Sequence, residues 1–261
     1  MGFGIATTAI IPMREEPRHQ SEMISQVLFG ETMKILELQD EWTKLKLDFD
    51  GTEGWIDNGM YHKLDANDYT LLKEANTLVL DTVSDIIIGN QVQPMRVMPG
   101  SEIHCNGQQS NKMVVGNEIF SLKHRTSIPM RGNIRHSVMT KALEYLNAPY
   151  LWGGRSLFGI DCSAFTQIVF KLHGILLPRE VEDQFSVGRL VKELQEALFG
   201  DLVFMANEQG QICHVGIMIE PNKIIHADSF VRFAYINEKQ VFNVDSKTSK
   251  FKVAYIKNVI D

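Results

Sequence analysis

The chain has 261 residues, of which 44% are apolar and 22% are charged, and its net charge is −6. This composition is that of an ordinary folded protein, and the length allows one large domain or two to three smaller ones. The acidic balance and the lack of a basic block argue against a nucleic-acid surface as the main function, and no run of about 18 apolar residues predicts a membrane-spanning helix.

The first 64 residues read as short strands separated by turns. Apolar and polar residues alternate at 33–38 and 42–47, and Asp50-Gly51 is typical of a hairpin turn before a further short strand at 54–56. With further candidate strands at 5–11 and 25–29, five short strands in about 60 residues predict a small β-barrel.

Several residues of this stretch resemble a bacterial SH3-like domain. The matching features are Met13-Arg14-x-Glu16-Pro17, the turn at 27–30, Trp42 and the closing segment 54–56. The resemblance implies an SH3-like domain over residues 1–64.

The middle of the chain changes character twice. Residues 65–76 are polar and predict a linker, and residues 77–130 return to short candidate strands at 78–80, 86–88 and 113–115, with turns at Pro99-Gly100 and Asn106-Gly107. We interpret residues 77–130 as a second, divergent SH3-like β domain; the alternative is a β-insertion that belongs to the first domain.

From residue 135 the apolar period becomes helical. It predicts a helix at 138–146, a second helix after Asp161 and a charged helical stretch at 182–198. Strands follow, predicted at 201–205, 213–219, 223–227, 231–235 and 251–255. Helices followed by an antiparallel sheet predict an α+β domain over residues 135–261.

Three cysteines, Cys105, Cys162 and Cys213, are spread along the chain. An odd number without close pairs does not describe a disulfide framework, and no Cys/His spacing is typical of zinc. We expect neither a metal nor an organic cofactor. Cys105 lies beside a predicted turn with no base nearby, and we assign it no role.

Cys162 lies where a predicted helix begins, with Asp161 or Ser163 as the candidate N-cap. The unpaired backbone N–H groups and the dipole at a helix N-terminus stabilise a thiolate, which activates a cysteine nucleophile. The alternative is a buried core cysteine, the more common situation for this residue type.

Two histidines complete a catalytic hypothesis. His214 lies in a predicted strand, and His226 follows a tight turn, so the two strands are expected to pair. A hydrogen bond from His226 would orient His214, leaving its other nitrogen to act as a base on Cys162. The alternative for each histidine is a satisfied core or edge residue. The remaining histidines are expected on the surface: His19, His62, His104, His124, His136 and His173.

The C-terminal motifs resemble the NlpC-type, papain-like cell-wall cysteine peptidases. The matching segments are Tyr150-x-Trp-Gly-Gly154, Asp161-Cys162-Ser163, Leu177-Pro-Arg179, Gly200-Asp-Leu-Val-Phe204, His214-Val-Gly-Ile and Ile224-Ile-His226-Ala. Together with the N-terminal match, they resemble the branch of dipeptidyl-peptidases that cut γ-D-glutamyl–diamino acid bonds. The resemblance implies a papain-like α+β domain preceded by one or two SH3-like barrels.

The resemblance also implies a role for individual residues. Cys162 is the expected nucleophile, His214 the general base and His226 the orienting residue. Tyr150 is expected to position substrate or the oxyanion beside the backbone N–H of Cys162.

The remaining expectations concern the substrate pocket. Asp161 and Ser163 are expected to line it, with the Asp161 carboxylate holding the ammonium of a free N-terminal L-Ala. Glu53 and Tyr61 are our candidates for the acid and the tyrosine that the SH3-like domain contributes. The chain departs from the family at Phe199, where proline is common, and at residues 180–184, where smaller residues are common.

These expectations define a hypothesis about function. The protein is expected to hydrolyse the γ-D-Glu–diamino acid bond of short peptidoglycan peptides with a free N-terminal L-Ala, in cell-wall turnover or recycling. The alternatives are a non-catalytic cell-wall-binding protein, or an amidase or acyltransferase on the same fold. The sequence does not determine the diamino acid or the oligomeric state.

The compartment also stays open. The first residues lack the basic and apolar segments of a secretory signal. The protein is therefore expected either in the cytoplasm or, after removal of a leader, in the cell envelope, and the envelope is favoured.

Overall fold

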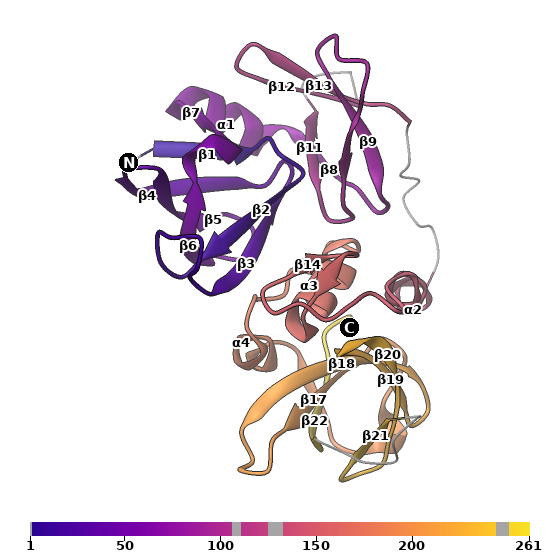
Figure 1. Cartoon of the computed structure of the whole chain (residues 1–261). Coiled ribbons are helices and arrows are strands. Elements are labelled where there is room, and N and C mark those ends of the chain that lie inside the picture. Colours follow the sequence, from indigo (N-terminus) through magenta and orange to yellow (C-terminus); the bar gives the residue numbers. More distant parts are fainter. Residues whose placement is uncertain (1, 106–110, 125–132, 244–250) are drawn as a thin grey trace. The chain divides into compact units, whose positions relative to one another are not determined.

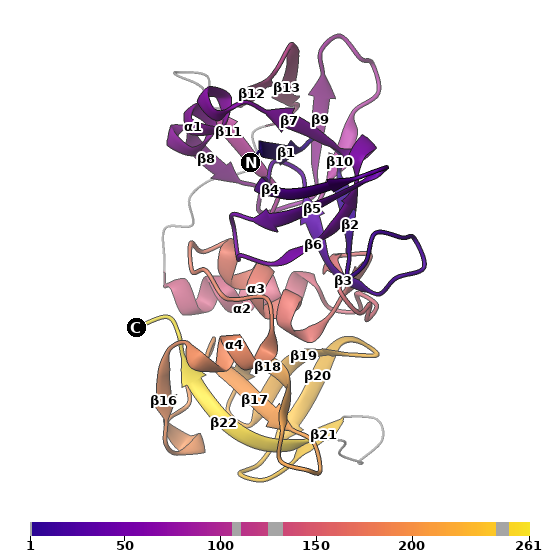
Figure 2. The same cartoon turned by 90° about the vertical axis from the view of Figure 1, so that its left-hand side faces the viewer.

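The structure, a computed structural model, describes residues 2–105, 111–124, 133–243 and 251–261. It divides into two compact units, Met1–Ile128 and Pro129–Asp261, which are traced in Figures 1 and 2. The predicted turn at Asn106-Gly107 lies outside the described residues. Within the described ranges, none of the helices combines the length and the hydropathy that spanning a bilayer requires.

The N-terminal unit begins with a seven-stranded antiparallel sheet in the order β3-β2-β6-β5-β4-β1-β7. Its strands are β1 (Gly2–Ala6), β2 (Ile10–Arg14), β3 (Met23–Leu28), β4 (Thr32–Gln39), β5 (Trp42–Leu47), β6 (Glu53–Asp57) and β7 (Tyr61–Leu64), with a 3₁₀ turn, η1 (Asn58–Met60), before the last. The strands predicted at 33–38 and 42–47 are therefore confirmed. The strand order is open, with β3 and β7 at its ends, so the predicted closed barrel is not confirmed.

The residues that we predicted as a polar linker, 65–76, contain a helix instead. Helix α1 (Ala66–Glu74) begins after Asp65, whose side chain accepts a hydrogen bond from the backbone N–H of Asp68 at 2.8 Å. Leu72 is the buried side chain of this helix, and it packs in the same apolar cluster as Leu64 and Leu80. Burial of this one side chain anchors a segment whose polar composition hides it from pattern analysis.

Six further strands complete the N-terminal unit. They are β8 (Asn76–Val79), β9 (Ser84–Ile88), β10 (Met95–Val97), β11 (Glu102–Cys105), β12 (Lys112–Val115) and β13 (Glu118–Leu122), arranged as a four-stranded sheet, β10-β9-β13-β12, and a pair, β11-β8. Ile5 of β1 and Phe29, which directly follows β3, share an apolar cluster with Ile103 and Phe120 of this second group. The unit therefore has a core that joins its two parts.

His104 is buried in this unit, so its predicted place on the surface is wrong. Its Nε2 atom lies 2.7 Å from the carbonyl oxygen of Gly30, and its Nδ1 atom lies 2.9 Å from the hydroxyl of Thr77. A buried imidazole needs partners for both nitrogens, and here they come from positions 74 and 27 residues away. Such distant partners cannot be inferred from local pattern.

The C-terminal unit places helices on a second seven-stranded sheet, in the order β16-β22-β17-β18-β19-β20-β21. The strands are β16 (Arg189–Val191), β17 (Leu202–Ala206), β18 (Ile212–Glu220), β19 (Lys223–Asp228), β20 (Phe230–Ile236), β21 (Val241–Asn243) and β22 (Lys252–Asn258). The helices are α2 (Ile134–Glu144), α3 (Cys162–Lys171) and α4 (Val181–Ser186). A short hairpin, β14 (Arg155–Ser156) and β15 (Gly159–Ile160), and a 3₁₀ turn, η2 (Leu194–Glu196), complete the unit.

The predicted helix at 182–198 is wrong beyond Ser186. Gly188 has a φ of 79°, a left-handed conformation that ends a helix, and the chain then enters β16, which pairs with β22. Pairing with residues 65 to 69 positions later overrides the local helical pattern. Each of the five strands predicted for this unit is present, as β17, β18, β19, β20 and β22. Helices α2 and α3 lie over one side of the sheet in both views (Figures 1 and 2).

Candidate active site

Helix α3 begins at the predicted cysteine because Asp161 caps it. The Asp161 backbone is extended, and its Oδ1 atom accepts a hydrogen bond from the backbone N–H of Ala164 at 2.8 Å. Every residue of α3 is buried, so the helix is a central element of the unit. Cys162 is its first residue and lies at the N-terminal end of the helix dipole.

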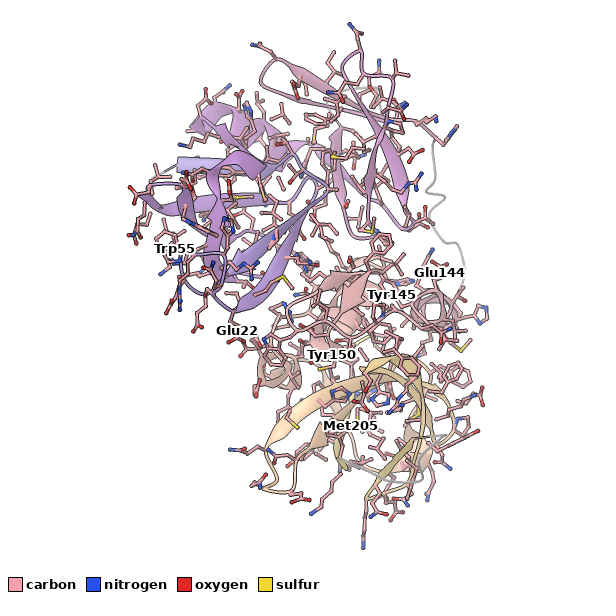
Figure 3. The ribbon with its side chains drawn as sticks, in the orientation of Figure 1. Glu22, Trp55, Glu144, Tyr145, Tyr150 and Met205 are labelled. Carbon is pink, nitrogen blue, oxygen red and sulfur yellow. The ribbon has the colours of Figure 1, made fainter. Side chains whose placement is uncertain are left out.

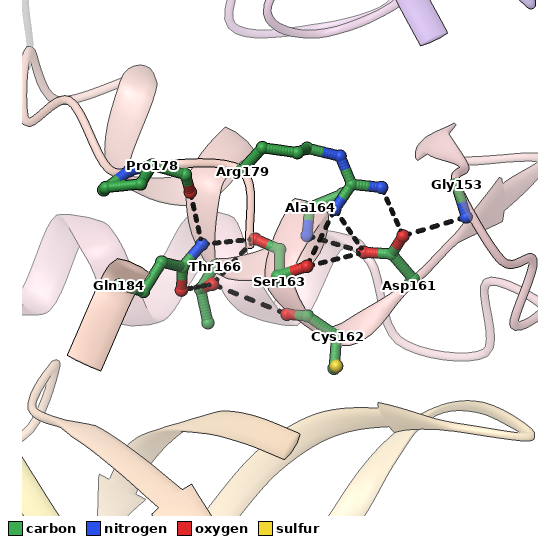
Figure 4. A network of polar contacts seen from close by, with 9 residues as sticks. All are labelled: Gly153, Asp161, Cys162, Ser163, Ala164, Thr166, Pro178, Arg179 and Gln184. Carbon is green, nitrogen blue, oxygen red and sulfur yellow. Dashed lines mark hydrogen bonds and ion pairs between the residues drawn. The ribbon is translucent and has the colours of Figure 1, made fainter. Parts of the chain in front are cut away.

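Asp161 is the centre of a buried polar network, drawn in Figure 4. Its Oδ1 atom also accepts from the Ser163 hydroxyl at 3.1 Å and from Nη1 of Arg179 at 3.1 Å. Its Oδ2 atom accepts from the backbone N–H of Gly153 at 2.9 Å and from Nη2 of Arg179. Asp161 and Arg179 are each 5% exposed, so each charge is balanced by the other away from water.

This network bears on the role that we predicted for Asp161, which stays a prediction. A carboxylate offers roughly four lone-pair positions, and five donors already point at this one. A substrate ammonium would have to displace one of these donors. Ser163 is engaged as well, because its hydroxyl accepts from Nη1 of Arg179 at 2.8 Å.

A second set of contacts fixes the first turn of α3 from α4. The side-chain amide of Gln184 donates to the carbonyl oxygens of Ser163 and Pro178, both at 2.9 Å. Its oxygen accepts from the Thr166 hydroxyl at 2.7 Å. Gln184 and Thr166 are fully buried. The loop that carries Arg179 is therefore tied to the helix that carries Cys162 at more than one point (Figure 4).

The Cys162 side chain is 6% exposed. The backbone N–H groups of Val215 and Ser163 donate hydrogen bonds to its sulfur. Burial, followed by the negative charge of Asp161, raises the pKa of Cys162 to about 12, although both hydrogen bonds and Arg179 act in the opposite direction. Burial and Asp161 therefore oppose the thiolate stabilisation that is expected at the helix N-terminus.

His214 and His226 meet as the strand register requires. In β18 and β19, Gly216 is paired with His226, and His214 lies two residues before Gly216 on the same face. The Nε2 atom of His214 lies 2.9 Å from the Nδ1 atom of His226. His214 is 5% exposed and His226 is fully buried. With Nε2 facing His226, Nδ1 is the nitrogen of His214 suited to act on another group.

A β-bulge precedes His214. In the pairing of β17 with β18, Met205 is opposite His214 but Ala206 is opposite Ile212, which leaves Cys213 as the extra residue. Bulges of this kind redirect the neighbouring side chains and are common beside active sites. Cys213 itself is exposed. The next residue after His214 is Val215, whose N–H contacts the Cys162 sulfur, so the bulged strand passes directly beside the nucleophile.

Tyr150 lies near the cysteine. Its backbone N–H donates to the carbonyl oxygen of Ser229 at 3.0 Å, and Figure 3 shows it on the side of the helices, with Met205 in the sheet. Burial, and then the nearby Cys162 and Asp161, raise the pKa of Tyr150. The phenol therefore keeps its proton and can donate a hydrogen bond beside the nucleophile.

Glu53 and Tyr61 belong to the N-terminal unit. Glu53 is exposed and pairs with Lys46 at 3.1 Å, whereas Tyr61 is 7% exposed and its hydroxyl lies 2.9 Å from that of Thr43. Tyr61 is thus a core residue of its own unit. A contact of either residue with substrate stays a prediction.

Sequence analysis missed two members of the network around the nucleophile, Arg179 and Gln184. The sequence places Arg179 in a family motif but predicts no role for it. The available signal was physical: an acidic residue that begins an apolar, fully buried helix needs a buried counter-charge. Nothing local indicates which of the basic residues supplies it. Within the described ranges, no group of three or more His, Cys, Asp or Glu side chains is placed to hold a metal ion.

Comparison with known proteins places these features in a family. Residues 147–250 match the NlpC/P60 family, and residues 13–59 match the bacterial dipeptidyl-peptidase SH3 domain. A γ-D-glutamyl-L-lysine dipeptidyl-peptidase of Bacillus subtilis (strain 168) is 29% identical over 216 residues, which cover 78% of this chain and 71% of that protein. A dipeptidyl-peptidase 6 of Lysinibacillus sphaericus is 22% identical over 232 residues, covering 81% and 82%.

The fold is also that of a solved structure. The crystal structure of an NlpC/P60 family protein from Bacillus cereus ATCC 10987 superposes with a TM-score of 0.80 at 18% identity, covering 99% of this chain and all of that one. The chain therefore combines an NlpC/P60 family domain with a bacterial dipeptidyl-peptidase SH3 domain that precedes it.

Proposed function

We propose that the protein is a cysteine peptidase that hydrolyses the γ-D-Glu–diamino acid bond of short peptidoglycan peptides with a free N-terminal L-Ala. The observation that carries the proposal is the position of Cys162. It begins a buried helix, and its sulfur contacts the strand residue that follows His214. The names of the two relatives, each matched over most of its length, support the bond and the dipeptide product.

In the proposed reaction, the Cys162 sulfur attacks the carbonyl carbon of the scissile bond and its proton passes to Nδ1 of His214. The oxyanion accepts hydrogen bonds from the Cys162 backbone N–H and the Tyr150 phenol. The C–N bond then breaks as the leaving amine takes the proton from His214, and a thioester remains. Water, deprotonated by the same histidine, hydrolyses the thioester and restores the thiol.

The raised pKa of Cys162 determines how this nucleophile is activated. Because burial raises the pKa of Cys162, the thiol is expected to give up its proton to His214 as it attacks. His226 supports this step by holding Nε2 of His214 at 2.9 Å, which stabilises the imidazolium that forms. Slow alkylation by iodoacetamide at pH 6 is therefore the expected behaviour of the resting enzyme.

Preference for a free N-terminus requires a carboxylate that can hold the substrate ammonium. It was assigned to Asp161, whose oxygens already accept from Arg179, Gly153, Ser163 and Ala164. If Asp161 binds an ammonium, the substrate has to replace a donor of this network. Glu53, which is exposed in the N-terminal unit, stays a candidate for the same role.

The test is a mass-spectrometric digest of L-Ala-γ-D-Glu-meso-diaminopimelate and its L-Lys counterpart, each with a free and with an acetylated amine. The proteins are wild type, Cys162→Ala and, as a matched control, Cys213→Ser at the exposed cysteine. We expect wild type and the control to release L-Ala-D-Glu from the free peptides, and Cys162→Ala to release none. The comparison of the two substrates identifies the diamino acid.

Other outcomes of this digest would indicate a different specificity or a different function. Cleavage of both free and acetylated peptides would retain the nucleophile but make the enzyme an endopeptidase with Asp161 locked by Arg179. No cleavage by wild type would reject the proposed bond. If Cys162 then forms thioesters with other acyl donors, the amidase or acyltransferase alternative holds; if it forms none, the cell-wall-binding alternative holds.

A further inference from the structure

Phe251 lies flat against the imidazole of His214. The two ring centroids are 4.5 Å apart and the ring planes differ by 1°. Phe251 immediately precedes β22 and lies one residue beyond the segment 147–250 that matches the NlpC/P60 family. The family match therefore assigns it nothing, although it makes a ring contact with the histidine beside the nucleophile.

The sheet register explains how Phe251 reaches His214. A row of paired residues crosses three strands: His214 in β18, Met205 in β17 and Val253 in β22. Paired residues share a face, and Phe251 shares it with Val253 because the two are separated by one residue. Phe251 also packs against the apolar cluster that contains Met205, and its ring stacks on His214.

The backbone of Phe251 is held in place. Its carbonyl oxygen accepts a hydrogen bond from the N–H of Val241 at 3.4 Å, and the N–H of Val253 donates to the carbonyl oxygen of Lys239 at 3.2 Å. The ring is half-buried. Phe251 is thus a fixed wall against one face of the imidazole rather than a mobile surface side chain.

The stack and the hydrogen bond restrict different motions of the imidazole. The contact of Nε2 with His226 at 2.9 Å fixes one corner of the ring but still permits the ring plane to tilt about that corner. A parallel aromatic ring removes the tilt, so the direction of Nδ1 is defined. The π face of a phenyl ring also attracts a cation, so the contact favours the imidazolium that forms when the thiol loses its proton.

We propose that Phe251 is a positioning residue that holds the His214 ring in its working plane and stabilises the protonated ring during attack by Cys162. The proposal rests on the proposed function for the role of His214 as a base. Phe251 acts through His214 and does not itself contact the reacting atoms.

The kinetic test uses Phe251→Leu, Phe251→Met and Phe251→Tyr. The aliphatic variants keep an apolar side chain but lose the ring, and the tyrosine keeps the ring. Phe233→Leu is the matched control, because Phe233 is a half-buried phenylalanine of β20 in the same sheet, in contact with Lys223. We expect both aliphatic variants to lower kcat about tenfold or more with KM within about twofold, since small misplacement of a catalytic group has large effects. The tyrosine variant and the control should stay within about threefold of wild type.

A second readout does not depend on the substrate. In protein labelled with ¹⁵N-histidine, the ring nitrogens of His214 should give the shifts of one tautomer in wild type and in Phe251→Tyr. They should move toward averaged values in the aliphatic variants, at unchanged melting temperature. If the shifts and kcat of both aliphatic variants match those of wild type, Phe251 only fills space and the proposal is overturned. If wild type cleaves none of the peptides while the ring shifts still respond, the proposed function fails but the positioning role stands.

Discussion

Helices α1 and α3 both begin after an aspartate N-cap, but the two caps lie in different surroundings. In each, an aspartate before the helix accepts a hydrogen bond at 2.8 Å from a backbone N–H three residues later: Asp65 from Asp68, and Asp161 from Ala164. Asp65 is exposed, and α1 buries Leu72. Asp161 is buried against Arg179, and α3 is buried throughout.

The difference shows what distinguishes the helix that carries the candidate nucleophile. An N-cap aspartate is common and only sets where a helix begins. At α3 the same carboxylate also pairs with the buried guanidinium of Arg179 and accepts a hydrogen bond from the backbone N–H of Gly153. The position of Cys162 therefore depends on an ion pair made by the cap residue itself, and variants of the two caps should behave differently.

The largest effect is expected from removing the guanidinium of Arg179. Arg179→Met leaves the Asp161 carboxylate buried without a counter-charge, and we expect the free energy of unfolding of the C-terminal unit to fall by about 3–5 kcal/mol. Hydrogen exchange in urea, read by mass spectrometry on peptides of α3, measures this. The control is Arg18→Met, which breaks an exposed pair with Glu16 and should change stability by less than about 1 kcal/mol. Equal losses of unfolding free energy in the two variants would show that the buried pair matters no more than the exposed one.

The double variant Asp161→Asn/Arg179→Met sharpens the comparison. Asparagine still caps a helix, while both buried charges are gone. The double variant should therefore be more stable than the sum of the two single losses implies, by a coupling energy of about 1–3 kcal/mol. The same hydrogen-exchange measurement on wild type, the two single variants and the double variant gives this coupling energy. Strict additivity would mean that the two side chains do not act as a pair.

A smaller loss is expected at Gln184. Gln184→Leu removes the buried amide that donates to Ser163 and Pro178 and accepts from Thr166. Leaving such buried groups unsatisfied costs about 1–3 kcal/mol, and opening of the first turn of α3 should speed the exchange of its amides. Gln195→Leu, at an exposed glutamine of the same unit, is the control and should have little effect. Unchanged exchange at α3 would show that Gln184 is dispensable there.

The cap of α1 should matter least among these substitutions. Asp65→Ala is expected to cost about 0.5–1 kcal/mol, because water replaces the lost acceptor at an exposed helix end. Exchange should rise in α1 peptides alone, with α3 and peptide cleavage unchanged. A loss as large as that of Arg179→Met would show that the two caps do not differ in kind.

The last prediction concerns the pH dependence of stability, which the Cys162 thiol should change only at alkaline pH. Burial raises the pKa of Cys162 to about 12 in the folded protein, above the value of about 8.5 for an unfolded thiol. As pH rises through this window, the unfolded state loses the proton first, so wild type should lose stability relative to Cys162→Ser. Urea unfolding of both proteins at pH 7 and at alkaline pH measures the difference. A constant difference would mean that Cys162 is not shielded as described.

Local patterns predicted much of the fold and the start of the site. The beginning of α3, the strands of the first sheet and the two histidine strands all follow from capping residues and apolar period. What local pattern could not supply comes from distant pairings: burial of Leu72 that forms α1, the pairing of β16 with β22 beyond Gly188, and the Arg179 partner of Asp161. The contact of Phe251 with His214 belongs to the same class, because it depends on a row of residues across three strands.

The several structural contacts of Asp161 have a consequence for the redesign of this protein. A substitution there alters the helix start, the buried charge balance and the Gly153 loop at once, so the position cannot be tuned for a single trait. Neighbours that carry fewer duties are the better place for a library. The exposed Glu180 beside the network is such a position, where substitutions can alter selectivity while the contacts that hold the nucleophile are kept.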